Sequence, residues 1–533
     1  MLKLVLGTSG SGKTTLLYAR IRARAEAGKR SILLVPEQFT SSTEARIYRE
    51  LGDALSGMVE SYSFTSLAEH ILAIEGGAAV QTLTDAGRAV LVRRALEELQ
   101  DNVHYYYRHR RSAAFCQMAA ETIDELKSAG LSGQQLQELA RDCGTESAKL
   151  GELALIFQGY ESLLAGTGMD PADRLELAAD RLEAALARDE LPDFLREREV
   201  FIDEFDTFNA PKKRLMGAML AALPAVTVAL CEDGAPMQPG DLELFSGAKQ
   251  VAAQLRQLAR KNGAQVAAPE LLRRDLRHKD APGLAALTEL LETGSCTPPE
   301  SAPELRLFAA ASREEEARCA AAAIRRLMRQ GVRCGKIAVV CRDISLYRAA
   351  VRYEFRMAEI PLYCDEPTTP EFSAPATAVR ALLALLRGAD MTEQLTVLAK
   401  TGLCDLTEPE VCALENYAYT WSPNAAAWRA EFTKSPRGFG DAELTEEDTL
   451  NLTRAENARK KLVTAVDTLR SKVRSANAEQ ISRALYFCLK ELGAEGQQAA
   501  QVEDIRTARG IPAAEEAARE WNVVMQLLDE MAR

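Results

Sequence analysis

The sequence has few aromatic residues, few histidines and no long apolar run. Phe, Trp and Tyr together make up 6% of its 533 residues, and only four histidines are present. The N-terminus MLKLVLGTSG lacks the basic and apolar regions of a secretory leader. A membrane-spanning helix needs about 20 mostly apolar residues in a row, and no such run occurs. These absences indicate a cytoplasmic protein with no membrane partner.

Metal-binding cysteine patterns are also absent. Eleven cysteines are scattered along the chain, none with C-x-x-C spacing and none placed beside a histidine. A zinc finger needs such ligand pairs, so this class of site is excluded. Buried, reduced thiols are the simplest interpretation of the cysteines.

The net negative charge argues against a protein whose overall charge attracts nucleic acid. The net charge is −12, and 27% of the residues are charged. DNA affinity depends on the phosphates that basic side chains neutralise, so any DNA contact must come from local basic grooves. At this length we expect several domains, and the abundance of Ala, Leu, Glu and Arg favours helices.

Strands and helices alternate in much of the first half of the chain. Short apolar runs that predict strands lie at Leu2–Leu6, Ser31–Val35, Met58–Tyr62, Val200–Ile202 and Val226–Leu230. Helical patterns separate these runs, which is typical of a parallel sheet with crossover helices. The expected fold class is therefore α/β, with parallel sheets flanked by helices and with large all-helical insertions.

Other segments have different patterns. Residues 83–196 and the chain beyond 392 contain helical patterns without strand-like runs, so both are expected to be helical insertions. Residues 266–303 include TPPESAP and are expected to form a linker. A second α/β unit should follow, with strands at Leu305–Ala309 and Lys336–Cys341.

The most specific motif is the glycine loop, Gly7–Thr14, which matches the phosphate-binding pattern G-x-x-x-x-G-K-[ST]. A strand precedes it and a helix follows it, and a chance glycine-rich turn is the alternative. The glycines let backbone N–H groups turn inward around phosphates, Lys13 supplies charge to the β- and γ-phosphates, and Thr14 offers a hydroxyl to Mg²⁺. The expected ATP-binding residues are Gly7, Thr8, Ser9, Gly10, Ser11, Gly12, Lys13, Thr14 and Thr15.

Two carboxylates end a later apolar run. Asp203 and Glu204 follow Val200–Ile202 directly. Asp203 would hold Mg²⁺ indirectly, through the ligands bound to the metal, and Glu204 would orient an attacking water, so Lys13 and Glu204 are candidate catalytic residues. The alternative is a strand end that merely meets solvent. Lys13 and Asp203 are 190 residues apart with a helical insertion between them, a separation typical of superfamily-1 helicases and longer than in small nucleotide kinases.

The segments around these motifs resemble the AddB family, the second subunit of the bacterial AddAB (RexAB-like) helicase–nucleases. The resembling segments include LLVPEQFTSSTE (Leu33–Glu44), VESYSFTSLAEHIL (Val59–Leu72), FIDEFDTFNAPKKRLMGAML (Phe201–Leu220) and RCGKIAVVCRDISLYRAAVRYEFRMAEIPLYCDEP (333–367). By this resemblance, Ser63 and Phe64 would lie near DNA. Arg342 occupies the position of the motif IV arginine and is a third candidate catalytic residue.

The resemblance implies a subunit of an ATP-dependent helicase/exonuclease, with ATP and Mg²⁺ as cofactors. With an AddA-type partner it would process double-stranded DNA ends for recombinational repair, and it would scan single-stranded DNA for the Chi sequence. It implies superfamily-1 helicase-like domains: 1A at 1–82 and 197–265, insertion 1B at 83–196, a linker at 266–303, the start of 2A at 304–391 and a 2B-like insertion at 392–533. The family's nuclease domain and iron–sulfur cluster are expected only beyond residue 533.

Some departures from a working motor keep alternatives open. ALCEDGAPM (229–237) carries no Gln or Arg of the usual coupling motif. The main alternative is therefore a regulatory or scaffold DNA-binding subunit without motor activity of its own, and a third is a phosphate-loop enzyme acting on a small molecule. Arg342 could reach the γ-phosphate, or it could form a salt bridge at a strand end.

Three weaker features have simpler interpretations. Residues 105–111 (YYYRHRR) interleave aromatic and basic side chains as a single-strand stacking groove would, but a solvated helix start is simpler. Residues 212–214 (KKR) could clamp a phosphate, but a solvated helix face is simpler. Trp421, Trp428 and Trp521 lie in helical pattern and are expected to be core or interface residues.

Overall fold

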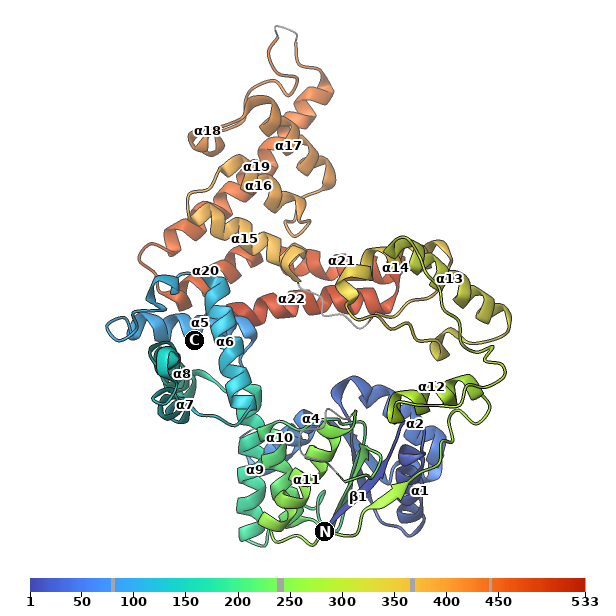
Figure 1. Cartoon of the computed structure of the whole chain (residues 1–533). Coiled ribbons are helices and arrows are strands. Elements are labelled where there is room, and N and C mark those ends of the chain that lie inside the picture. The colour runs from blue at the N-terminus through green and yellow to red at the C-terminus, as the bar shows by residue number, and fades with distance from the viewer. Residues whose placement is uncertain (78–81, 237–243, 365–369, 441–442, 533) are drawn as a thin grey trace. The chain divides into compact units, whose positions relative to one another are not determined.

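The computed structural model describes residues 1–77, 82–236, 244–364, 370–440 and 443–532 (Figure 1). The chain divides into two compact units. The first, the sheet unit, contains residues 1–80, 127–130 and 171–367. The second, the helical unit, contains residues 81–126, 131–170 and 368–533.

The sheet unit is built on six parallel strands in the order β3-β2-β4-β5-β1-β6. The strands are β1 (Leu2–Gly7), β2 (Ser31–Leu34), β3 (Val59–Tyr62), β4 (Glu199–Ile202), β5 (Ala225–Cys231) and β6 (Glu270–Leu272). In register, Gly7 lies opposite Cys231 on β5 and Leu272 on β6, while Leu34 lies opposite Tyr62 on β3 and Ile202 on β4. Because all strands are parallel, the segments that follow β1, β4, β5 and β6 meet at one edge of the sheet.

Helices cover both faces of this sheet. Leu2, Leu4 and Leu6 pack on one face with α4 (Phe64–Glu75), α9 (Pro171–Ala187), α10 (Ala210–Ala222) and α11 (Ser246–Lys261). Val5 points to the other face and packs with α1 (Lys13–Glu26) and α2 (Thr40–Leu51), which the short α3 (Asp53–Ser56) follows. Strands buried on both faces read as largely apolar runs, which is why β1, β2, β4 and β5 were predictable, whereas β3, also predicted, is only partly buried. The predicted α/β class is confirmed.

The last part of the sheet unit contains regular elements where a linker was expected, followed by a pair of packed helices. Residues 266–303, expected as a linker, contain both β6 and α12 (Pro282–Thr293). Further on, α13 (Arg313–Arg329) and α14 (Ile344–Met357) pack against each other through Ile324 and Phe355. The boundaries of the expected helicase-like domains stay a prediction.

The prediction of strands at Leu305–Ala309 and Lys336–Cys341 was wrong. Neither segment forms a strand, and neither pairs with another segment among the residues that the structure describes. Leu307 is 99% exposed and Val340 is 91% exposed. An apolar run becomes a strand only when a neighbouring strand accepts and donates its ladder hydrogen bonds, so the sequence pattern alone was insufficient.

Within the described residues, the regular elements of the helical unit are helices. Its N-terminal part contains α5 (Asp85–Glu98), most of α6 (Ala113–Ser128), α7 (Gly133–Ala140) and α8 (Ser147–Thr167). Its C-terminal part contains α15 (Ala374–Leu386), α16 (Met391–Lys400), α17 (Glu408–Trp421), α18 (Ala425–Arg429), α19 (Glu446–Lys472), α20 (Ala478–Glu491), α21 (Ala494–Arg509) and α22 (Ile511–Ala532). Trp428 is fully buried in the larger core of this unit, as expected of a core tryptophan.

Two further expectations concerned buried cysteine thiols and membrane-spanning helices. All eleven cysteines are free thiols, but only Cys116, Cys404 and Cys488 are buried, so the expectation of buried thiols was wrong for the others. No described helix is both long enough and apolar enough to cross a membrane.

Candidate nucleotide-binding site

The glycine loop joins β1 to α1 at the edge of the sheet where the strands end. Gly10 and Gly12 have φ angles of 80° and 91°, in the left-handed region that glycine adopts without strain. A Cβ on Gly7 would lie 2.4 Å from Ser11 Oγ and 2.7 Å from the carbonyl oxygen of Leu272. No side chain caps the N-terminus of α1, so its first N–H groups remain available to an anion.

Lys13 is the first residue of α1 and folds back onto the loop. Its Nζ donates to the carbonyl oxygens of Gly7 and Thr8, both at 2.8 Å. Burial lowers the pKa of Lys13, although the nearby Cys231 and Asp203 act in the opposite direction. An ammonium that carries its charge in a partly buried loop is suited to bind phosphate.

Asp203 is brought to Thr14 by the strand order. It follows β4, which β5 separates from β1, and it is 5% exposed. Thr14 and Asp203 line a common cavity, and the backbone N–H of Glu204 donates to Asp203 Oδ1 at 3.0 Å. Burial raises the pKa of Asp203, and hydrogen bonding with Thr14 and with the Glu204 N–H opposes the rise. The structure thus brings the two predicted Mg²⁺ residues to the same cavity.

Glu204 has an unusual backbone conformation. Its φ angle is 66°, a left-handed value that is uncommon for a residue with a side chain. Desolvation raises the pKa of Glu204, and the charge of Asp203 raises it further. Strained residues with raised carboxylate pKa values cluster at functional sites, so both observations fit a residue that handles a water or a proton.

A cavity of 650 Å³ opens beside these carboxylates. Thr14, Asp203 and Glu204 contribute to its wall, together with Tyr18 of α1 and Arg46 of α2. The Arg46 guanidinium lies 4.8 Å from the centre of the Tyr18 ring, and its charge lowers the pKa of both carboxyl groups. Arg46 was not predicted from sequence, because it follows the recognisable segment Leu33–Glu44 and belongs to no motif.

The other loop residues differ in their surroundings. Ser9 Oγ accepts a hydrogen bond from Arg277 Nη1 at 3.2 Å, and an interaction with Thr8 lowers the pKa of Glu292, which burial raises. Ser11 Oγ is buried and has no protein partner among the described residues, whereas Thr15 lies exposed in the first turn of α1.

The residues present fit a Mg·ATP ligand. The left-handed glycines let the loop turn without strain, and a buried hydroxyl of the loop, Ser11 Oγ, is unpartnered within the described chain. The described residues hold no group of three or more His, Cys, Asp or Glu side chains that could bind a metal by themselves. Mg²⁺ at nucleotide sites needs only one or two protein ligands besides phosphates and waters, and Thr14 and Asp203 are the candidates for this role.

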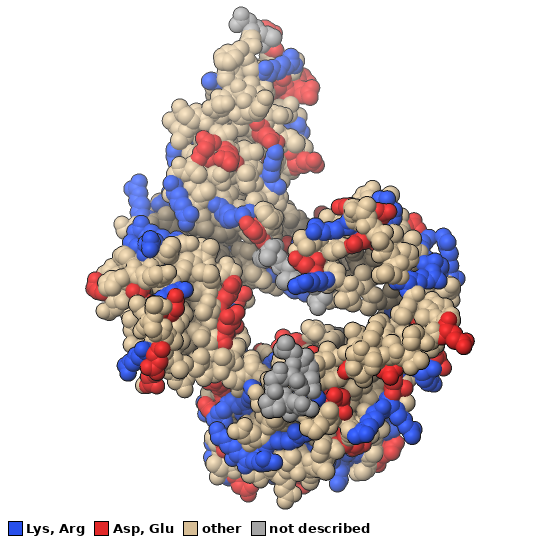
Figure 2. Space-filling model, in the orientation of Figure 1, with Lys and Arg blue, Asp and Glu red and all other residues tan. Residues whose placement is uncertain are grey.

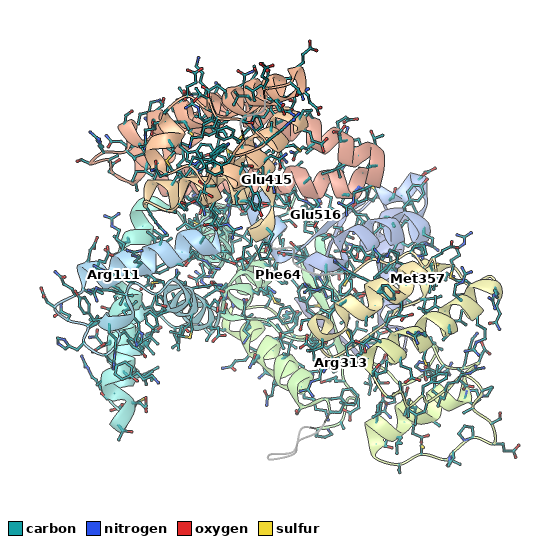
Figure 3. All side chains as sticks on the ribbon, turned by 90° about the horizontal axis from the view of Figure 1, so that it is seen from above. Phe64, Arg111, Arg313, Met357, Glu415 and Glu516 are labelled. Atoms are coloured by element: carbon teal, nitrogen blue, oxygen red, sulfur yellow. The ribbon has the colours of Figure 1, made fainter. Side chains whose placement is uncertain are left out.

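Ser63 and Phe64, expected near DNA, begin α4 on the sheet edge after β3. Ser63 Oγ accepts from the backbone N–H of Ser66 at 3.1 Å and is 4% exposed. Phe64, which is labelled in Figure 3, is 2% exposed, and its ring meets that of Phe205 edge-on at 5.3 Å. Phe64 therefore supports the sheet edge from within, and a DNA contact of this pair stays a prediction.

Arg342 is not brought to the glycine loop. It is exposed after the extended segment 337–341, and no hydrogen bond or ion pair of Arg342 occurs among the described residues. Its proposed role at the γ-phosphate stays a prediction, and the strand-end salt bridge is not formed within that part of the chain.

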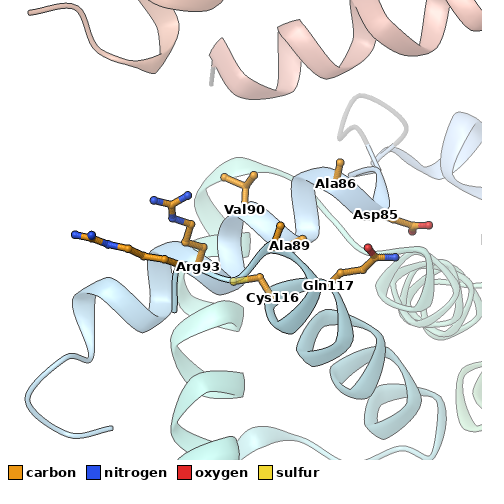
Figure 4. A pocket seen from close by; sticks show the side chains of 9 residues that line it. Asp85, Ala86, Ala89, Val90, Arg93, Cys116 and Gln117 are labelled. Carbon is orange, nitrogen blue, oxygen red and sulfur yellow. The ribbon is translucent and has the colours of Figure 1, made fainter. Parts of the chain in front are cut away.

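The weaker basic features are engaged in local contacts. Tyr106 stacks on Phe115 at 5.4 Å, and Arg110 lies 3.7 Å over the Tyr107 ring. Arg111 borders a separate cavity of 430 Å³ in the helical unit, which Arg93, Cys116 and six other residues complete (Figure 4). Among residues 212–214, Lys212 lies 5.5 Å from the Phe205 ring and Arg214 pairs with Asp180 at 2.9 Å. On the face shown in Figure 2, acidic and basic side chains are interspersed.

The chain is similar in sequence to known proteins over most of its length. The ADDB N-terminal family model matches residues 4–288. Three similar relatives, each named as a subunit of an ATP-dependent helicase/deoxyribonuclease, are 30% identical to the chain. Those from Moorella thermoacetica and Desulforudis audaxviator each match 99% of this chain and 47% of their own length. That from Symbiobacterium thermophilum matches 81% of this chain and 38% of its own length. The chain spans about half the length of the first two relatives.

Proposed function

Because the chain belongs to the AddB N-terminal family, we propose that it is the Mg·ATP-binding, helicase-like part of a subunit that processes double-stranded DNA ends. The observation that carries the proposal is that Thr14 of the glycine loop and Asp203 at the end of β4 line one cavity. Two motifs 190 residues apart meet in one site, as an ATP-binding fold requires.

Each residue has a role that follows from its chemistry. Bound Mg²⁺ would offset the negative charge of the phosphates. Lys13 would turn from its carbonyl partners toward phosphate oxygens, and the N–H groups of the loop would donate to the same oxygens. Thr14 and Asp203 would hold the metal side of the site. Glu204 would orient a water, and Arg46 would offset the negative charge that gathers there.

The proposal extends to partners through the family. The relatives are named as subunits of a helicase/deoxyribonuclease, which supports an AddA-type partner and a DNA-end substrate. We place single-stranded DNA at the sheet edge near Ser63, with Phe64 as the support beneath it, and we retain Chi scanning as the role of that contact.

ATP binding can be tested on the 533-residue chain with Lys13→Ala, using Lys29→Ala as a control because Lys29 is exposed just after the end of α1. Loss of one charged phosphate contact should weaken Mg·ATP by at least about tenfold, since charge-assisted hydrogen bonds contribute roughly 1.5–3 kcal/mol. Equal affinity of the Lys13→Ala and Lys29→Ala proteins would contradict the proposal.

A second candidate is a regulatory subunit whose ATP site does not drive movement. It is favoured by residues 229–237, which lack a coupling Gln or Arg. The rate of ATP hydrolysis with and without single-stranded DNA separates the two candidates. Strong stimulation by DNA supports a motor, and binding without stimulated turnover supports the regulatory role.

A further inference from the structure

The chain that follows β6 lies directly on the glycine loop. The backbone N–H of Leu276 donates to the carbonyl oxygen of Gly10 at 3.0 Å. A Cβ on Gly10 would lie 2.8 Å from the Cβ of Arg277, and a Cβ on Gly12 would lie 3.1 Å from a methyl carbon of Leu276. The loop glycines therefore permit this close approach in addition to their role around phosphate.

Asp275 holds this segment in a defined turn. Its Oδ1 accepts from the backbone N–H groups of Arg277 at 3.0 Å and His278 at 3.1 Å. Its Oδ2 lies 2.9 Å from Nδ1 of the His278 ring. The backbone of Arg277 is thereby fixed beside the loop, and its side chain extends to Ser9.

Arg277 adds a second positive charge to the loop. Although burial is the largest influence on the pKa of Lys13, the charge of Arg277 also lowers it. One donor of the guanidinium is used on Ser9, and no other side-chain hydrogen bond or ion pair of Arg277 occurs among the described residues. A guanidinium has five donors in a planar fork, so this side chain can bind a phosphate while its turn stays in place.

Glu292, near the end of α12, brings a carboxylate to the same loop. Burial raises the pKa of Glu292, and its interactions with Thr8 and with the charge of Lys13 oppose that rise. A carboxylate at a loop built for anions balances the two cations when no nucleotide is bound. Phosphate at the same loop would meet a like charge.

We propose that residues 273–293 complete the nucleotide site, with Arg277 as a second phosphate-binding residue and Glu292 as the carboxylate that phosphate displaces. This inference rests on the proposed ATP binding and adds two residues outside the glycine loop and the Asp203 strand. It predicts that removing the charge of Arg277 weakens Mg·ATP binding and that removing the charge of Glu292 tightens it, because the first attracts phosphate and the second repels it.

The test is calorimetric titration of Mg·ATP into the 533-residue chain and four variants. Arg277→Ala should weaken binding about tenfold, and Arg277→Lys should recover part of the loss because it restores the charge without the fork. Glu292→Gln should tighten binding about threefold by removing a like charge. Arg274→Ala is the matched control, because Arg274 is exposed on the same segment and should leave affinity unchanged. Thermal unfolding without nucleotide verifies that each variant is folded.

The outcomes separate this inference from the proposal on which it rests. If the wild-type chain does not bind Mg·ATP, both fail. If it binds and Lys13→Ala weakens binding at least about tenfold, but Arg277→Ala stays within about twofold of wild type, only the inference fails. Weaker binding by Glu292→Gln would also overturn it, since a purely structural contact would lose affinity in both variants.

Discussion

Glu204 holds a left-handed backbone conformation immediately after the buried Asp203. The fold retains this strain beside a carboxylate whose pKa burial raises. A site that binds a metal and a nucleotide gains from such groups, because the ligand supplies the compensating charge. In the unliganded chain the same groups cost stability, and this cost can be measured one residue at a time.

Replacing Glu204 with glycine should stabilise the unliganded fold. Glycine adopts a φ of 66° without strain, so the free energy of unfolding should rise by up to about 1 kcal/mol after the greater freedom of glycine in the unfolded chain is counted. Denaturant unfolding measures this change. Glu359→Gly is the control for backbone strain away from the site, since Glu359 has a φ of 53°. Loss of stability in Glu204→Gly alone would contradict the strain argument.

Asp203→Asn should change how stability depends on pH. Burial raises the folded-state pKa of Asp203 above its ordinary 3.8, so the folded state binds this proton more tightly than the unfolded chain does. The stability it contributes is complete below the ordinary pKa and is lost as pH rises through the folded value. Asparagine does not titrate, so the variant should gain stability relative to wild type as pH rises from about 4 to neutrality. A difference in unfolding free energy that is constant over this range would contradict the assignment.

The residues that could be predicted from sequence are those within motifs. Lys13, Thr14 and Asp203 were identified because their residue types and order are set by phosphate and metal chemistry. Arg46, Arg277 and Glu292 were not, because each reaches the site through tertiary packing of a helix or turn whose local sequence is ordinary. Their roles depend on the strand order, which local periodicity does not encode.

The strands around the site show which local sequence patterns are sufficient to predict a strand. β1, β2, β4 and β5 are apolar on both faces and were found within one or two residues of their bounds. β6 was missed because it has only three residues and begins with a charged one, Glu270, directly after Pro269. The runs at 305–309 and 336–341 have the composition of strands but lack a neighbouring strand in the described chain. An apolar composition can suggest a strand, but the segment forms one only when a neighbouring strand pairs with it.

The N-terminus of α4 offers a test at the element scale. Ser63 and Ser66 form a reciprocal capping box, in which Ser63 N donates to Ser66 Oγ at 2.8 Å. Ser63→Ala should lower the free energy of unfolding by about 1 kcal/mol, the usual contribution of an N-cap. If Ser63 also contacts DNA, single-stranded DNA affinity should fall under conditions in which the variant is fully folded. Thr84→Ala, which removes the cap of α5, is the control for a cap in the helical unit. Equal DNA affinity of the two variants would remove Ser63 from the DNA interface.

At the scale of the whole molecule, the two units have separate cores. The glycine loop, Asp203, Arg46, Arg277 and Glu292 all belong to the sheet unit. The core of the helical unit includes Trp428, whose Nε1 donates to Thr392 Oγ1 at 2.9 Å. Nucleotide affinity should therefore depend on the sheet unit and be insensitive to damage in the helical core.

Trp428→Ala tests this separation. Removing a fully buried tryptophan should cost the helical unit about 3–5 kcal/mol. Hydrogen exchange should accelerate in α15 to α20 and stay near wild type in β1, β4 and α1, and Mg·ATP affinity should stay within about twofold. Loss of protection in both units together would show that they unfold as one.

The central claim is that Thr14 and Asp203 form the metal side of a Mg·ATP site, and the Mg²⁺ dependence of ATP binding tests it most directly. ATP affinity would be measured with Mg²⁺ and with a chelator for the wild-type chain, Thr14→Val and Asp203→Asn. The wild-type chain should lose at least about tenfold in affinity when Mg²⁺ is removed, whereas both variants should respond weakly because their metal ligands are gone. The account would be contradicted if both variants lost as much ATP affinity on removal of Mg²⁺ as the wild-type chain does. It would also be contradicted if the wild-type chain did not bind ATP.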